Sequence, residues 1–120
     1  MITIKTKNEI EILREGGRIL ANVINEVRKI VKAGVSTKEL DRLANQLINK
    51  AGDRPSFLNY TPNGAKRPFP ASACISVNEE IIHGIPNENP KILKEGDIVG
   101  IDIGLAHRGM FTDSAVTVGV

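Results

Sequence analysis

Two aspartates near the end of the sequence, Asp102 and Asp113, are the side chains best suited to chemistry. They lie in two strand-like segments, residues 98–106 and 110–118, which a turn sequence joins into a hairpin. If the turn is centred between residues 107 and 108, Asp102 and Asp113 are direct cross-strand neighbours on one face. Like charges in that arrangement destabilise a sheet, and more so beside buried apolar residues. The spacing therefore predicts that a positive charge lies between the two carboxylates.

Several arrangements satisfy this pattern. Arg108 or a distant Lys could neutralise the pair, one Asp could stay protonated, or the register could slip by one residue and separate the two side chains. Alternatively, the two carboxylates bind divalent metal ions, which activate a water molecule and polarise a carbonyl group. The metal interpretation predicts a hydrolase, and carboxylate oxygens suit Mg, Mn, Co, Fe or Zn without choosing among them. The spacing of the aspartates leaves these alternatives open.

Two predicted helices precede the hairpin. Thr6 and Glu9 have the spacing of a capping box, and the apolar stripe that follows them predicts a long helix that closes at Gly34. The same spacing at residues 36 and 39 predicts a second, shorter helix that stops at Gly52. The glycine pair at residues 16 and 17 falls inside the first helix, where it indicates close approach of another backbone or a bend.

The segment between the helices and the hairpin is expected to contain a loop and then two short strands. Residues 55–70 are rich in Pro, Gly, Asn and single aromatic residues, which is typical of an ordered loop and often of a site. Residues 73–77 and 81–85 are each expected to form a short strand. The order of elements predicts an α+β fold in which two leading helices are followed by an antiparallel sheet.

Composition bounds the class of protein. The chain has 120 residues, enough for one domain, and the net charge of +2 is spread among acidic neighbours, which argues against a nucleic-acid partner. The single cysteine, Cys74, excludes an intramolecular disulfide and fits a reducing compartment. No segment approaches the roughly 20 consecutive apolar residues of a membrane-spanning helix. These observations predict a cytoplasmic protein of a single domain, residues 1–120, without a membrane partner.

Several motifs together resemble type I methionine aminopeptidases. They are the segment Ala-Cys-Ile-Ser-Val-Asn-Glu-Glu-Ile-Ile-His-Gly-Ile-Pro at 73–86, Gly-Asp-Ile-Val-Gly-Ile-Asp-Ile at 96–103, Pro-Ser-Phe-Leu at 55–58, and the two aspartates eleven residues apart. With the leading pair of helices, the resemblance covers essentially the whole chain. It implies the N-terminal half of the pita-bread (creatinase/aminopeptidase-like) fold.

The resemblance also implies a role for particular residues. Asp102 and Asp113 are the expected metal ligands in a site for two divalent ions (Co, Mn, Fe or Zn), with Asp113 bridging them. His83 is the expected catalytic residue, which contacts the substrate and helps its peptide nitrogen through the tetrahedral intermediate. His107, at the hairpin tip, has no counterpart in the family and is expected to be exposed to solvent.

Three further residues are expected to contact the substrate. Cys74 resembles a position that lines the pocket for the methionine side chain, and Tyr60 or Phe69 adds an aromatic contact that suits a thioether. The implied substrates are peptides or nascent chains that begin with methionine.

Family members are about twice this length, and their second half supplies further metal ligands. This chain is therefore expected to hold part of a site, to be inactive on its own, and to associate through an uncovered sheet face. Two alternatives remain: a non-catalytic binding module or half-enzyme that needs a partner chain, and an Xaa-Pro peptidase of the same fold.

Overall fold

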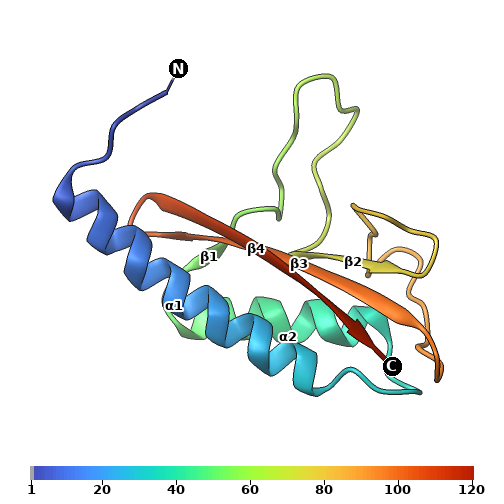
Figure 1. Ribbon diagram of the computed structural model, residues 1–120. Coiled ribbons are helices and arrows are strands. Elements are labelled where there is room, and N and C mark those ends of the chain that lie inside the picture. Colours follow the sequence, from blue (N-terminus) through green and yellow to red (C-terminus); the bar gives the residue numbers. More distant parts are fainter. Residues whose placement is uncertain (1) are drawn as a thin grey trace.

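The computed structural model describes residues 2–120, in which two helices pack on one face of a four-stranded antiparallel sheet (Figure 1). The expected α+β order of elements is confirmed. Within residues 2–120, neither helix combines the length and the hydrophobicity that crossing a lipid bilayer requires. The elements in chain order are α1 (Lys7–Lys29), α2 (Thr37–Lys50), β1 (Arg54–Pro55), β2 (Ala73–Val77), β3 (Ile98–His107) and β4 (Met110–Gly119).

The predicted capping box starts α1. The Glu9 N–H donates to Thr6 Oγ1 over 3.2 Å, and the Thr6 N–H donates to Glu9 Oε2 over 2.7 Å. The predicted end at Gly34 is wrong, because α1 ends at Lys29. The chain beyond it pairs with a distant segment, as the Gly34 N–H donates to the carbonyl of Leu93 over 2.8 Å.

The second helix follows its sequence signals more closely. Ser36 is the N-cap of α2 and accepts a hydrogen bond from the Lys38 N–H. The helix ends at Lys50, and Gly52 follows it with a φ of +83°, as expected for the residue that turns the chain away from a helix.

Strand β3 is the centre of the sheet. Its first half pairs with β2, its last residues pair with the short β1 on the same edge, and β4 runs along its other edge for ten residues. The strand predicted at 73–77 is confirmed as β2, and the strand predicted at 81–85 is wrong. That segment crosses β2 as a loop, in which the Ile75 N–H donates to the Gly84 carbonyl and the Gly84 N–H donates to Ser76 Oγ.

The hairpin has a different register from the predicted one. Arg108 and Gly109 have positive φ values of 46° and 84°, so these two residues form the turn and His107 pairs with Met110. Asp102 consequently faces Ala115, and Asp113 faces Gly104. The predicted direct pairing of the aspartates is wrong by two residues. Because side chains alternate with a period of two, a shift of two residues leaves both aspartates on the same face as diagonal neighbours.

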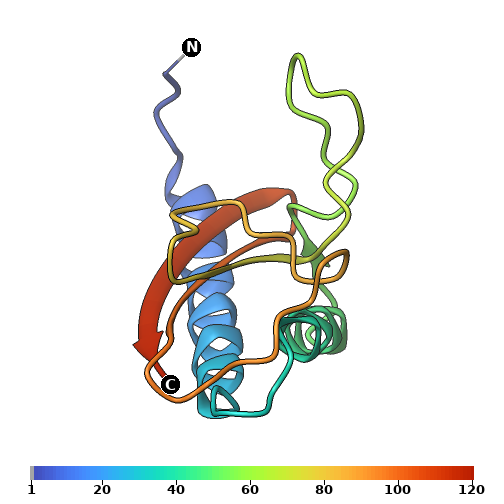
Figure 2. The same ribbon diagram turned by 90° about the vertical axis from the view of Figure 1, so that its right-hand side faces the viewer.

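The hydrophobic core lies between the helices and the sheet. Figure 2 shows both helices on one side of the sheet and the 57–70 loop on the other. The odd-numbered residues Ile101, Ile103 and Leu105 of β3 are fully buried on the helix side. The even-numbered residues of β3, Asp102 among them, therefore face away from the helices.

The tip of the hairpin is held against the helices by His107. Its Nδ1 lies 2.8 Å from Asp53 Oδ1 and its Nε2 lies 3.2 Å from Glu15 Oε2, and these two carboxylates raise the pKa of the imidazole. The side chain of His107 is only 14% exposed, so the predicted solvent exposure is wrong. A Cβ atom at Gly16 would lie 3.1 Å from His107 Cβ, whereas Gly17 has nothing within 4 Å. The close approach at Gly16 is thus to side chains of the hairpin, His107 and Thr112, and not to another backbone as predicted.

Candidate active site

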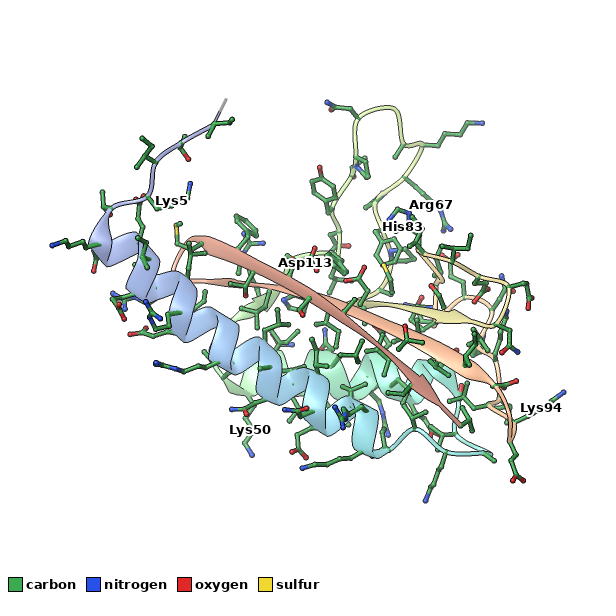
Figure 3. All side chains as sticks on the ribbon, viewed as in Figure 1. Lys5, Lys50, Arg67, His83, Lys94 and Asp113 are labelled. Carbon is green, nitrogen blue, oxygen red and sulfur yellow. The ribbon has the colours of Figure 1, made fainter. Side chains whose placement is uncertain are left out.

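A pocket of about 380 Å³ opens on the sheet face that lies away from the helices. It contains both aspartates and every residue that the sequence suggested for substrate contact. Figure 3 shows two of them, Asp113 and His83, on that side of the sheet. The lining residues are Phe57, Tyr60, Pro62, Phe69, Cys74, His83, Ile85, Asp102 and Asp113.

The two acidic residues and Cys74 owe their places to the sheet register. Cys74 is the cross-strand partner of Asp102, and Asp113 is the partner of Gly104, so all three side chains project from the same face. The start of β2 is fixed by Asp41 of α2, whose Oδ1 accepts hydrogen bonds from the backbone N–H groups of residues 72 and 73 over 2.8 and 2.9 Å. A buried carboxylate in the helix layer thus sets the position of the thiol.

The two aspartates form a like-charged pair. Burial first, and then the contact with Asp113, raise the pKa of Asp102 to about 6, while nearby His83 opposes the shift. Arg108, one candidate for neutralising the pair, instead forms an ion pair with Glu15 at 3.4 Å, so that alternative is wrong. A register slip of one residue is also wrong, because the shift is two. The raised pKa means that this pair holds a proton to higher pH than an isolated aspartate does, in line with the alternative in which one Asp stays protonated.

The carboxylates of Asp102 and Asp113 suit a metal ion but are too few to hold one alone. Within the described chain, no ion pair joins a basic side chain to either aspartate. Carboxylate oxygens that lack a basic partner are ligands that divalent cations prefer. Residues 2–120 contain no cluster of three or more His, Cys, Asp or Glu side chains placed to hold a metal ion. Asp102 and Asp113 can therefore supply two ligand side chains of a larger set.

The Cys74 thiol is neutral at ordinary pH. Burial first, and then the charges of Asp102 and Asp113, raise its pKa to about 12. The residue is 5% exposed and unpaired, and it offers the pocket a soft, weakly polar surface.

His83 reaches the pocket through an unusual backbone conformation. Its φ is +60°, a left-handed value that non-glycine residues seldom adopt. The next residue, Gly84, lies so close to β2 that a Cβ atom there would overlap the carbonyl oxygen of Ile75. Together these two residues turn the loop sharply at the edge of β2, which places the imidazole beside the acidic pair.

Three pocket residues were not predicted from the sequence: Phe57, Pro62 and Ile85. Phe57 packs edge-on against Phe69, with ring centroids 6.4 Å apart and an interplanar angle of 90°. It also covers Gly104, where a Cβ atom would lie 2.8 Å from Phe57 Cε1. A glycine inside a strand often marks such a close approach, so Gly104 was the signal that could have pointed to a side chain packed over it.

The 57–70 loop forms one wall of the pocket. Residues 59, 60 and 69 exchange backbone hydrogen bonds of 2.9 and 2.8 Å, which draw the two arms of the loop together. Near the tip, Arg67 makes two hydrogen bonds to the carboxylate of Glu88, at 2.5 and 2.6 Å. This pair joins the loop to the turn that follows His83 and Ile85, so opposite walls of the pocket are linked across its rim.

The sequence and the fold of this chain are similar to those of known metallopeptidases. Residues 11–120 match metallopeptidase family M24. Methionine aminopeptidase 1 of Bacillus subtilis is 50% identical over 98% of this chain, which corresponds to 44% of the relative. The crystal structure of methionine aminopeptidase from Thermotoga maritima superposes with a TM-score of 0.89 at 38% identity, over all of this chain and 45% of that one. Escherichia coli aminopeptidase P, at 24% identity and a TM-score of 0.77, shares the fold. The expected N-terminal half of the pita-bread fold is thus confirmed, and the chain spans less than half the length of these relatives.

Proposed function

Because the chain belongs to metallopeptidase family M24, we propose that it forms the N-terminal half of the catalytic domain of an aminopeptidase that removes methionine from the start of polypeptides. In this proposal residues 1–120 are one incomplete domain. The names of the relatives from Bacillus subtilis and Thermotoga maritima support the choice of methionine peptides as substrates. New polypeptides are made in the cytoplasm, and the buried, unpaired Cys74 is compatible with that compartment.

The proposal depends on one observation, that apolar side chains and a pair of acidic side chains line the same pocket. The apolar walls come from Cys74 and the edge-packed rings of Phe57 and Phe69. A methionine side chain is flexible and polarizable, and it packs well against sulfur and ring edges. With the thioether among these groups, the first peptide bond of the substrate lies beside the aspartates.

We assign the remaining polar groups by their position in the cavity. His83 is the catalytic residue, because an imidazole can donate a hydrogen bond to, or accept one from, the peptide nitrogen as that nitrogen becomes the leaving amine. Tyr60 lines the same pocket and contacts the substrate.

Asp102 and Asp113 are the ligands that this chain contributes to a site for two divalent metal ions. When bound, such ions supply a nucleophilic water at neutral pH and polarise the substrate carbonyl. The strands hold the two carboxylates in fixed positions before the ions bind, which lowers the cost of assembling the site. The sheet face around them is where we place the other ligands of the site, supplied by the rest of the fold or by a partner chain.

Metal binding by the chain itself tests the acidic pair. Calorimetric titration with Mn²⁺ should show binding that Asp113→Asn weakens by about tenfold or more, because one of two charged ligands is lost. Glu95→Gln removes the same charge from an exposed position outside the pocket and should leave the affinity unchanged. Equal loss in both variants would show that general charge, and not this pair, attracts the ion.

Peptide binding tests the pocket. Met-Ala-Ser should shift the NMR signals of Cys74 and His83, whereas Glu-Ala-Ser should not, because a carboxylate is disfavoured both among apolar walls and beside two aspartates. An Xaa-Pro peptide that shifts these signals as strongly as Met-Ala-Ser would favour the proline-specific alternative and contradict the proposal.

A further inference from the structure

A second cavity, larger than the pocket, lies next to it and is not used by the proposed chemistry. Its volume is about 640 Å³. Tyr60 lines both cavities, so they adjoin at this residue. The lining residues of this second cavity are Asn45, Asn49, Arg54, Pro55, Ser56, Leu58, Asn59, Tyr60 and Phe111.

Part of the second cavity lies on the same sheet face as the pocket, while Asn45 and Asn49 reach it from α2. Arg54 of β1 faces Ala106 of β3, which in turn faces Phe111 of β4. Ala106 and Asp102 are both even-numbered residues of β3, so this row of side chains projects on the same side as the acidic pair. The row lies four residues along β3 from Asp102 and two residues along β4 from Asp113. At about 3.3 Å per residue, the separation along the strands is roughly 7 to 13 Å.

The chemistry of the second cavity suits the backbone of a peptide. Three carboxamides and a hydroxyl group, from Asn45, Asn49, Asn59 and Ser56, line it, and such groups both donate and accept hydrogen bonds. Two of the carboxamides are already oriented, because Asn49 Nδ2 donates to the backbone oxygen and to Oδ1 of Asn45 at 2.8 and 2.9 Å.

The only charge in this lining is positive. None of its nine residues is acidic, and the guanidinium carbon of Arg54 lies 5.5 Å from the centre of the Phe111 ring. A guanidinium held over a ring and flanked by carboxamides can recognise a carboxylate through paired hydrogen bonds.

Two groups of cavities adjoin the pocket and offer room for the rest of a polypeptide, one at Tyr60 and one at the loop that carries His83. The group at the His83 loop lies by the exposed side chains of Ile81 and Ile82, where the cavities measure only about 110 and 180 Å³. The 640 Å³ cavity beside Tyr60 is the larger of these spaces and contains three carboxamides, although the smallest one shares His83 and Asp102 with the pocket.

Building on the proposed aminopeptidase function, we propose that this second cavity binds the extended polypeptide beyond the second residue of the substrate, and that Arg54 selects an acidic side chain at the fourth to sixth position. The positions follow from the separation of roughly 7 to 13 Å, which an extended chain crosses in two to four residues.

The test compares three peptides on the chain as it exists. Met-Ala-Ser-Glu-Glu-Glu should bind about three to tenfold more tightly than Met-Ala-Ser-Gln-Gln-Gln, and both should bind more tightly than Met-Ala-Ser. Arg54→Gln should abolish the preference for Glu. Arg42→Gln, which removes an exposed arginine of α2 that does not line the cavity, should preserve it.

The NMR signals of the wild-type chain locate each peptide independently of the variants. The proposal requires that the Glu hexapeptide shift the side-chain amides of Asn45 and Asn49 together with Cys74. Shifts at Cys74 with no gain in affinity from the longer peptides would overturn the second cavity and leave the methionine pocket intact. Shifts at Ile81 in place of Asn45 would overturn the direction. Shifts at Asn45 without Cys74 would overturn both the proposed function and this extension of it.

Discussion

Gly84, in the His-Gly-Ile-Pro motif, has no room for a larger side chain. A Cβ atom there would overlap the carbonyl oxygen of Ile75 and lie 2.7 Å from its carbonyl carbon. Because both atoms belong to the backbone of β2, no side-chain rotation can relieve the overlap. We expect Gly84→Ala to push the loop that carries His83 away from the strand.

The size of the effect follows from the contacts that such a shift would break. The Ile75 N–H donates to the Gly84 carbonyl at 3.0 Å, and the Gly84 N–H donates to Ser76 Oγ at 3.1 Å. Two hydrogen bonds at about 1 kcal/mol each, added to about 1–3 kcal/mol for overpacking, predict a loss of about 3–5 kcal/mol in the free energy of unfolding. Domains of this kind are typically stable by about 5–15 kcal/mol, so the variant should fold weakly or not at all.

Urea denaturation followed by circular dichroism measures this loss, with Gly17→Ala as the matched control. Gly17 lies in α1 with nothing within 4 Å of an added Cβ atom, so alanine there should raise the free energy of unfolding by up to about 1 kcal/mol. The same substitution is thus expected to have opposite signs at the two sites. A loss below about 1 kcal/mol at Gly84, with unchanged NMR signals for His83, would refute the reasoning.

Two further predictions concern polar groups that hold the site in place. Asp41→Ala would leave two buried backbone N–H groups at the start of β2 without an acceptor. Urea denaturation should therefore show a loss of about 1–3 kcal/mol in the free energy of unfolding. A change near zero would show that water replaces the carboxylate. Asp53 and Glu15 raise the pKa of His107 in the folded chain. The imidazolium therefore contributes its full stabilisation below the unfolded pKa of about 6.5. This contribution is lost as the pH rises through the pKa of the folded chain. His107→Gln should therefore cost most stability between about pH 5 and 6.5, and less at higher pH; a pH-independent difference would contradict the charged form.

Local signals predicted the elements well where the interaction itself is local. Thr6 and Glu9 cap α1 through groups three residues apart, so their spacing alone was sufficient. Gly34 was mistaken for the residue that closes α1, because its N–H binds the carbonyl of Leu93, far along the chain, and not a carbonyl of the helix. For the same reason His107 was mistaken for an exposed residue: its partners, Glu15 and Asp53, are 92 and 54 residues away.

The hairpin register was misjudged because two central turn residues need positive φ and only one of them is glycine. Gly109 was a visible signal, but Arg108 adopts a φ of 46° without a sequence preference that announces it. Asp102 and Asp113 still share one face, since the error was an even number of residues. The placement of Cys74 and His83 in the same pocket came from resemblance to a family, because neither residue signals its neighbour by spacing.

The central position of β3 has a consequence for how this chain acquires its structure during synthesis. Each strand pairing of the sheet includes β3, yet β3 begins only at Ile98. Until the ribosome has released that segment, β1 and β2 have no neighbour to pair with, and the apolar faces of both helices have no sheet to cover them. At about 5–20 residues per second, this exposed interval lasts several seconds. The nascent chain should therefore be most open to chaperones and proteases just before β3 emerges, and less so once β3 and β4 have paired.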